Sequence, residues 1–344
     1  MDGIEVRVGI YQDLRDPPRW QRGWGRGAAA ALERIEEAER LGIGAVWCTE
    51  HHFFDDGYLP QPLTWCAAVA ARTSRIAIGT ALIVAPLHHP IELAEQAAVV
   101  DQLSGGRLEL GLGAGYVARE FDAFGVNRSK RAARTEALAK EIRRLLEDGV
   151  VTPGPVQESL PIWLGAFGPK GARAAGRTGS GLLWISADLL SPYKEGLEEG
   201  GHDPSSARMA GIATIVVSKD PERAAATIAP HVDYQRQTYE HATSAKSAGE
   251  RMGQLAEGER VQGLDFPSAA APTYETLTPD QVVDKIEAWV ADMPVTDVMF
   301  FDSIAGMPDD LSNVKSPTSS SAIAFASALA AVKSLCAAYA MPRA

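Results

Sequence analysis

Residues 76–113 contain an apolar run, a helical segment and a second apolar run, and this order constrains the fold more than any other feature. The first run covers residues 76–82, and a helical spacing of apolar residues begins at Pro90. A Ser-Gly-Gly sequence ends the helix, and residues 107–112 then alternate leucine with other residues. A strand that is reached through a helix pairs with its predecessor in parallel. The segment therefore predicts a strand–helix–strand unit of a parallel sheet.

Short apolar runs of this kind recur along the chain, with helical segments between most of them. Alternating strands and helices predict a parallel sheet covered by helices, and eight such units favour a closed (β/α)₈ barrel, TIM-like and with insertions. The alternative is an open doubly wound sheet, but its dinucleotide fingerprint needs a glycine where this chain has Tyr116. The eight predicted strands are residues 6–11, 45–48, 76–82, 107–112, 162–164, 182–185, 212–217 and 297–301.

The barrel is expected to occupy residues 1–310 of the 344. A polar stretch at about 239–278 interrupts the alternation and is interpreted as an insertion. Residues 311–344 are rich in alanine and serine, and their apolar residues follow a helical spacing. This tail is therefore expected to form a helix packed on the barrel.

The formal charge of −11 argues against nucleic acid or an anionic membrane as a partner, because both bind clustered cations. Cys48, Cys66 and Cys336 lie far apart in the sequence and show neither a metal-binding nor a disulfide spacing. The chain shows no signal peptide and no run of about 18 strongly apolar residues. We therefore expect a soluble, cytoplasmic protein.

Groups at the carboxyl ends of barrel strands converge on one mouth, where sites form. Glu50-His51-His52-Phe53 follows the second predicted strand. One imidazole could supply a base near neutral pH, oriented by the carboxylate. Adjacent histidines point in different directions, so at most one is expected to face the mouth. In the alternative interpretation, both rings bond to the backbone of the loop.

His88 and His89 precede Pro90 at a predicted helix start. Proline suits the first helical turn, so the favoured interpretation is that a histidine caps the helix or packs beside it. One of the two rings could instead line the pocket.

A glycine-rich turn at residues 165–171 follows the fifth predicted strand and leads into a helix. Backbone N–H groups at a helix start, together with the helix dipole, can hold a phosphate. Lys170 or Arg173 could add positive charge. An ordinary tight loop is the alternative.

Several of these segments, taken in order, resemble the bacterial luciferase-like family of flavin-dependent monooxygenases. The similarity extends from the first strand to about Asp310. The segments that carry it are residues 46–53, 78–90, 101–113, 161–169 and 304–310.

The resemblance implies a TIM-like barrel that binds reduced FMN, which a separate flavin reductase supplies. Oxygen would add to the flavin to give a peroxide at ring carbon 4a, and this peroxide would oxygenate a small organic substrate. A homodimer is expected.

The resemblance also implies roles for individual residues. His51 matches the catalytic histidine, and Glu50 matches its neighbouring acid. Thr80-Ala81 falls where the family has a non-prolyl cis peptide under the flavin ring. The remaining expected cofactor contacts are Gly113 and Tyr116 along the ring, Phe167 and Gly168 at the phosphate, and Trp184, while Phe53, Tyr58 and His89 are expected in the substrate pocket.

Three other functions remain open. A deazaflavin-dependent oxidoreductase of the same fold is the first, although Glu-His-His-Phe leans toward FMN, because deazaflavin relatives more often have Ser-Asp-His-Phe there. The second is a metal-dependent barrel hydrolase, which usually needs His-x-His on the first strand, where this chain has Val8-Gly9-Ile10. A flavin-binding relative without activity is the third.

Overall fold

The computed structural model describes residues 6–244 and 274–307. Eight parallel strands form a closed ring in the order β3-β2-β1-β11-β8-β7-β6-β5, and pairing of β3 with β5 closes it. This arrangement confirms the predicted (β/α)₈ barrel. The barrel strands are β1 (Arg7–Gln12), β2 (Ala45–Cys48), β3 (Ala77–Thr80), β5 (Leu108–Gly113), β6 (Ile162–Gly165), β7 (Gly181–Leu183), β8 (Met209–Ala213) and β11 (Val295–Phe301).

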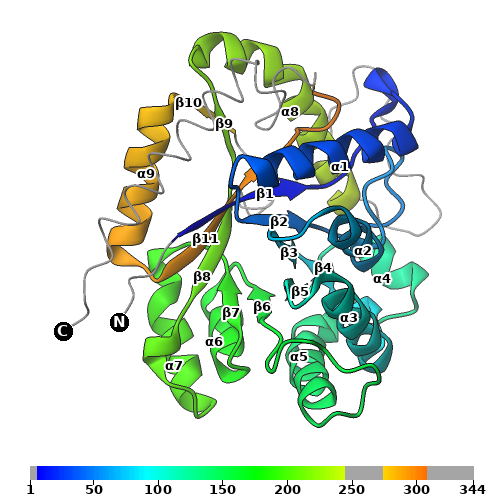
Figure 1. Cartoon of the computed structure of the whole chain (residues 1–344), viewed down its shortest axis with the longest axis vertical. Helices are drawn as coiled ribbons and strands as arrows, with labels where there is room; N and C mark the ends of the chain where they lie inside the picture. The colour runs from blue at the N-terminus through cyan, green and yellow to red at the C-terminus, as the bar shows by residue number, and fades with distance from the viewer. Residues whose placement is uncertain (1–5, 245–273, 308–344) are drawn as a thin grey trace.

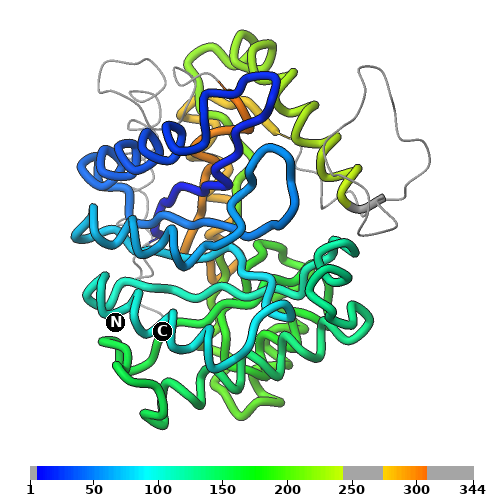
Figure 2. Tube along the Cα trace, turned by 90° about the vertical axis from the view of Figure 1, so that its right-hand side faces the viewer, coloured from blue at the N-terminus to red at the C-terminus, as the bar shows by residue number. Residues whose placement is uncertain are grey.

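Helices surround the strands, as Figures 1 and 2 show. The α-helices are α1 (Trp24–Arg40), α2 (Pro62–Arg72), α3 (Pro90–Ser104), α4 (Ala118–Ala123), α5 (Arg131–Glu147), α6 (Pro169–Arg177), α7 (Leu190–Glu199), α8 (Pro221–Ser244) and α9 (Pro279–Asp292). Short 3₁₀ helices are η1 (Pro18–Trp20), η2 (Ala85–Leu87), η3 (Arg128–Lys130), η4 (Ala187–Leu189) and η5 (Pro204–Ser206).

The strand–helix–strand unit expected at residues 76–113 is present. Every residue of β3 and β5 is buried, as expected for strands covered by helices on one side and barrel interior on the other. Helix α3 begins at Pro90 and ends at Gly105, which has the left-handed conformation (φ 68°) that glycine tolerates best. A short strand, β4 (Ile83–Val84), follows β3 and pairs with the carboxyl end of β5.

Two regions differ from the prediction. The expected strand at residues 212–217 is divided, because β8 stays in the barrel while β9 (Ile215–Val217) pairs with β10 (Glu275–Leu277) in a separate two-stranded sheet. The expected insertion at 239–278 begins inside α8 and includes β10 near its end. Residues 245–273 of that insertion, and the tail 311–344, lie outside the described residues.

Cys48 and Cys66 are close together, which their separation in the sequence did not indicate. Both are buried, and their Sγ atoms lie 3.6 Å apart. The distance is short because α2 packs on β2, which it follows in the chain.

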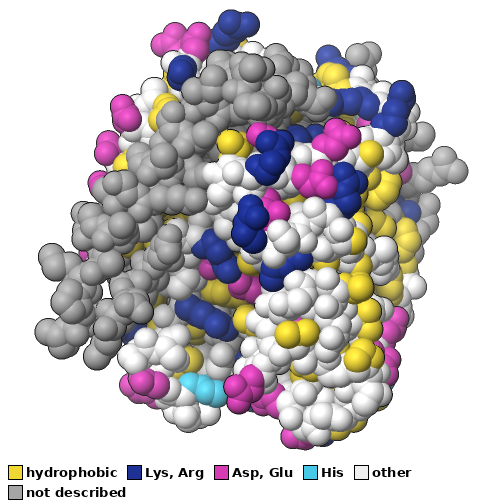
Figure 3. Space-filling model, in the orientation of Figure 1, with side chains coloured by type: hydrophobic (Ala, Val, Ile, Leu, Met, Phe, Trp, Pro, Cys, Tyr) yellow, Lys and Arg dark blue, Asp and Glu magenta, His cyan; other side chains and the backbone are white. Residues whose placement is uncertain are grey.

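On the face drawn in Figure 3, basic and acidic side chains are interleaved over the centre of the molecule. Within residues 6–244 and 274–307, no helix has the length and apolar character that crossing a membrane requires.

Candidate active site

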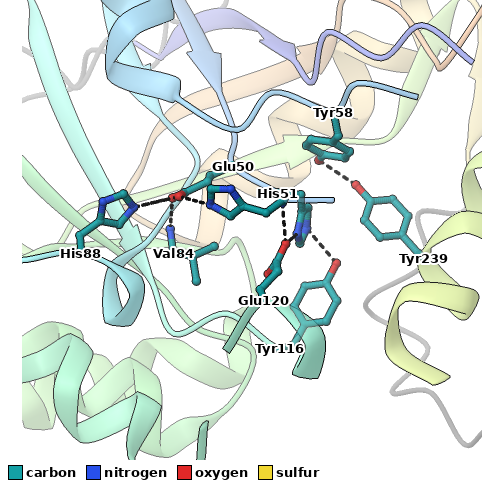
Figure 4. A network of polar contacts seen from close by, with 9 residues as sticks. Glu50, His51, Tyr58, Val84, His88, Tyr116, Glu120 and Tyr239 are labelled. Carbon is teal, nitrogen blue, oxygen red and sulfur yellow. Dashed lines mark hydrogen bonds and ion pairs between the residues drawn. The ribbon is translucent and has the colours of Figure 1, made fainter. Parts of the chain in front are cut away.

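His51 lies at the mouth of the barrel, directly after β2. The residue is 6% exposed, and both ring nitrogens have partners. Nδ1 lies 2.9 Å from Oε1 of Glu120, and Nε2 lies 3.1 Å from the hydroxyl oxygen of Tyr116 (Figure 4). Of the two adjacent histidines, His51 is therefore the one inside the mouth network.

Aromatic rings enclose His51. The rings of Phe54, Tyr58 and Tyr239 have centroids 5.1, 4.9 and 6.0 Å from the imidazole centroid. The hydroxyls of Tyr58 and Tyr239 are 2.9 Å apart (Figure 4). Burial raises the pKa of Tyr58 well above its ordinary value and raises the pKa of Tyr239 to about 12. These phenols therefore stay neutral and supply hydroxyl groups without charge.

Glu120 on α4 holds His51 from the other side. Its carboxylate is fully buried, and Oε1 also accepts the backbone N–H of His52 at 2.8 Å. A carboxylate facing Nδ1 favours the tautomer with the proton on Nδ1. Its other oxygen, Oε2, is one of the buried side-chain atoms in the described part of the chain with no hydrogen-bond partner. The sequence analysis missed Glu120, although an acidic residue between the apolar Val117 and Phe121, a few residues after a strand end, was a usable signal.

Glu50 belongs to a second network. Its Oε1 lies 2.8 Å from Nε2 of both His52 and His88, and its Oε2 accepts the backbone N–H of Val84 at 2.6 Å. The expectation that Glu50 orients the catalytic imidazole is therefore corrected, because its partners are the neighbouring histidines and β4 (Figure 4).

The pKa shifts of this second network follow from these bonds. Burial would raise the pKa of Glu50, but hydrogen bonds from His52 and His88 outweigh it and lower that pKa to about 2. Burial acts to lower the pKa of His88, yet the hydrogen bond and charge of Glu50 raise it overall. Each group of the Glu50–His88 pair therefore favours the charged form of the other, and the pair links the segment after β2 to the segment after β4.

A non-prolyl cis peptide joins Ala81 to Leu82, one residue later than the expected position at Thr80-Ala81. The hydroxyl of Thr80 donates to the carbonyl of Gly111 at 2.9 Å and accepts its N–H at 2.8 Å. The Thr80 side chain thus joins β3 to β5, and what it could offer a ligand is its backbone.

Leu82 lies over the ends of β5 and β6. A Cβ atom at Gly113 or Gly165 would come within 2.3 Å of a terminal methyl group of Leu82, so this side chain packs directly on both glycines. The half-buried Leu82 therefore covers both glycines at this end of the barrel.

The expected phosphate loop is at the start of α6. Gly168 is the N-cap, and a Cβ atom built there would meet nothing within 4 Å. Phe167 is 63% exposed and packs edge-to-face on Trp184 at 4.8 Å. Arg173 pairs with Glu195 and Glu199, so its charge is balanced, whereas Lys170 is exposed. The start of α6 therefore combines open space with the positive end of a helix dipole.

Two of the expected pocket residues lie on the rim. Phe53 is 44% exposed, has a left-handed backbone (φ 64°) and packs against Phe124 and Arg119. His89 is exposed and caps α3 by accepting the N–H of Ile91 at 3.3 Å. The capping interpretation of His89 is the one that the geometry supports.

Behind the aromatic rings lies Arg15, whose side chain is fully buried. It donates to Asp56 at 2.6 Å and stands 5.2 to 5.7 Å from the ring centroids of four aromatic residues, Tyr58 among them. Burial outweighs the attraction of Arg15 and raises the pKa of nearby Asp13 to about 7. Among the described buried atoms, Oδ2 of Asp13 and Nη1 of Arg15 have no hydrogen-bond partner.

A separate cavity of about 490 Å³ opens between α1 and the ends of β1 and β11. Its lining includes Asp16, Arg22, Arg34 and Asp302, and none of the side chains that contact His51 lines it. Arg34 pairs with Asp302 across it. The cavity therefore opens at the same end of the barrel as His51 and is lined by Asp13 and Arg15, but it does not include the residues that surround the imidazole.

Comparison with known proteins identifies the class. Residues 14–297 match the family described as "Luciferase-like monooxygenase", and the chain belongs to that family. The match confirms the resemblance inferred from the sequence. By family, the chain is a luciferase-like oxidoreductase.

Relatives within the class differ in the reaction that their names give. Limonene 1,2-monooxygenase of Rhodococcus erythropolis is 30% identical over 170 residues, which are 45% of this chain and 44% of the relative. An F420-dependent glucose-6-phosphate dehydrogenase of Amycolatopsis mediterranei is 30% identical over 187 residues, 48% of this chain and 56% of the relative. The matches thus span about half the length of these relatives. The class therefore includes both a monooxygenase and an F420-dependent dehydrogenase.

Solved structures support the fold. The monooxygenase RslO1 from Streptomyces bottropensis superposes with a TM-score of 0.72 at 22% identity, covering 94% of this chain and 99% of that one.

Proposed function

We propose that this chain is an FMN-dependent monooxygenase that transfers one oxygen atom from O₂ to a small organic substrate. The observation that carries the proposal is a buried imidazole, His51, held between Glu120 and Tyr116 inside a wall of aromatic rings. A site without bulk water suits oxygen activation, because water promotes loss of hydrogen peroxide from a reactive intermediate.

The residues present fit FMN. The apolar side chain of Leu82, packed on Gly113 and Gly165, suits contact with a planar ring, and the open start of α6 at Gly168 suits a phosphate. Oε2 of Glu120 is a hydrogen-bond acceptor at the mouth that has no partner in the described part of the chain. Reduced FMN, when bound, would supply the electrons that activate oxygen.

The chain itself would orient the ligands, exclude water and manage one proton. Phe54, Tyr58 and Tyr239 wall the space around the imidazole. His51 is placed to hold or release a proton at Nε2 while Glu120 holds Nδ1. The reduced flavin would come from a separate reductase, and a homodimer is expected.

An anaerobic titration with reduced FMN and, separately, with reduced F420 tests the cofactor. We expect saturable binding of reduced FMN that is tighter than that of F420. With ¹⁸O₂ and a panel of small substrates, the product should carry one labelled oxygen. Tight binding of F420 alone, with hydride transfer and no label in any product, would replace this proposal with the second candidate.

That second candidate is an F420-dependent dehydrogenase. It is favoured by the identity to the glucose-6-phosphate dehydrogenase, which equals the identity to the limonene monooxygenase at 30%. The same imidazole would then accept the proton of a substrate alcohol, so the roles of His51 and Glu120 would remain.

A further inference from the structure

We infer that Tyr116 exchanges a proton directly with the bound ligand, and that His51 and Glu120 act behind it as a relay. The three groups lie in series. The Tyr116 hydroxyl is 3.1 Å from Nε2 of His51, and Nδ1 of His51 is 2.9 Å from Glu120 (Figure 4). This is the order of hydroxyl, imidazole and carboxylate that activates a nucleophilic serine in hydrolases, here with a phenol in the first place.

Access distinguishes Tyr116 from the other two members. His51 and Glu120 are buried, whereas Tyr116 is half-buried. Both nitrogens of His51 already have protein partners, and the Tyr116 hydroxyl covers Nε2. A ligand that enters the mouth therefore meets the phenol before the imidazole.

The direction of the hydrogen bonds follows from Glu120. An ionised carboxylate only accepts, so Nδ1 of His51 carries the proton in that pair. In the neutral imidazole, Nε2 then has a lone pair and accepts the O–H of Tyr116. The oxygen of Tyr116 keeps its own lone pairs, which can accept a hydrogen bond from a ligand.

The proton transfer balances without an additional reactant. A ligand group X–H gives its proton to the Tyr116 oxygen while the phenol proton moves to Nε2 of His51. The products are X⁻, a neutral phenol and an imidazolium next to the Glu120 carboxylate. No group is oxidised or reduced. The reverse transfer protonates a ligand anion.

Burial keeps the phenol neutral between transfers. Burial and the charges near Tyr116, of which Glu120 is one, raise its pKa well above the ordinary value, although Arg15 opposes them. A stable phenolate is therefore unfavourable. Between transfers the Tyr116 oxygen keeps a proton, and it loses one proton only as it gains another. Arg128 donates to the Tyr116 carbonyl at 3.2 Å and helps to fix this segment.

The first test uses the protein without cofactor. ¹⁵N NMR of the His51 ring, assigned by comparison with His51→Gln, reports which nitrogen is protonated. The relay predicts the Nδ1–H tautomer in the neutral ring. The Nε2–H tautomer would reverse the bond to Tyr116 and overturn the inference.

The second test is kinetic, and it rests on the proposed function for the reaction that is followed. Tyr116→Phe and His51→Gln should each lower the rate at saturating reduced FMN by about 10²- to 10⁴-fold. The double variant should be no slower than the slower single variant, because groups that act as one unit are not additive. Tyr193→Phe is the control. It removes a buried hydroxyl on α7 that donates to the Ser180 carbonyl, and it should keep the wild-type rate.

The outcomes separate the two claims. If Tyr116→Phe weakens flavin binding but keeps the wild-type rate at saturation, Tyr116 is only a ring contact and the relay is wrong. Multiplying effects in the double variant would also contradict it. If the wild-type protein binds no reduced FMN, the proposed function fails while the tautomer measurement still tests the relay.

Discussion

The two ends of the barrel use buried charge in different ways. At the amino-terminal end, Arg7 pairs with Asp297 and Glu109, and Glu109 also accepts the indole N–H of Trp163 at 2.8 Å. These partners come from β1, β11, β5 and β6, so the network ties four strands together. At the mouth, Glu120 Oε2, Asp13 Oδ2 and Arg15 Nη1 have no partner among the described buried atoms.

This difference indicates which buried charges stabilise the fold and which serve the site. Burying a charge is costly, and the Arg7 network at the amino-terminal end offsets the cost with partners from neighbouring strands. The mouth leaves polar atoms without partners, a cost that is reasonable only where a ligand completes them. We therefore expect substitutions at the amino-terminal end to alter folding stability and substitutions at the mouth to alter the reaction.

The largest expected effect is at His51. His51→Gln should lower substrate-dependent oxygen uptake by about 10²- to 10⁴-fold, because a glutamine side chain cannot accept and release a proton as an imidazole can. Glutamine can still hydrogen-bond to Glu120, so the melting temperature should change little. Unchanged product yield at equal protein concentration would remove His51 from the chemistry.

At the opposite end, Arg7→Met should act on stability instead. It leaves Asp297 and Glu109 buried without their cation, which costs about 3 kcal/mol of unfolding free energy, at the lower end of the range for broken buried pairs. Arg75→Met, at an exposed position before β3, is the matched control. Denaturant titration measures both. Equal stability of the two variants would show that the Arg7 network does not hold the strands together.

The Glu50–His88 pair predicts a pH dependence that neither of these variants would give. The pKa of Glu50 is about 2 in the fold against an ordinary 4.5, so its stabilisation of about 3 kcal/mol is present above pH 4.5 and is lost as the pH falls toward 2. The pKa of His88 is raised above 6.5, so its stabilisation is complete below that pH and is lost as the pH rises through the folded-state value. The pair therefore contributes most between these limits.

His88→Gln measures this contribution. Its loss of unfolding free energy relative to wild type should be larger at about pH 5.5 than at about pH 8.5, because the contribution of His88 declines once the pH exceeds the ordinary pKa of 6.5. A loss that is the same at both values would mean that the fold does not raise the pKa of His88.

The smallest effect is expected away from both ends, at the start of α9. Thr278 and Gln281 form a capping box there. Thr278→Ala should cost about 1 kcal/mol, and Thr278→Ser should cost much less because it keeps the accepting oxygen. Neither change should alter oxygen uptake. A change in activity here would weaken the division between scaffold and mouth.

Much of the scaffold could be predicted from local patterns. The period of apolar residues, with Pro90 and Gly105 as helix ends, located α3 and both flanking strands. The same patterns missed the division of β8 from β9, because a strand that leaves the barrel has the same apolar composition as one that stays.

The site was predicted less completely. His51 was found because its motif is contiguous, but its partner Glu120 is 69 residues away and Tyr239 lies at the edge of a stretch without a readable pattern. Glu50 was favoured as the partner of His51 because it is adjacent in the chain and matches the acid beside the catalytic histidine in the resembling family. Which side chains meet at the mouth depends on the closure of the barrel, which no local pattern contains.

The most direct test of the central claim follows the His51 ring by NMR during an anaerobic titration with reduced FMN. If the mouth is the flavin site, the His51 resonances should shift and saturate together with the flavin signal, and those of the exposed His89 ring should shift less. Saturable binding of FMN that leaves the His51 resonances unchanged would place the flavin elsewhere and contradict the assignment of this site.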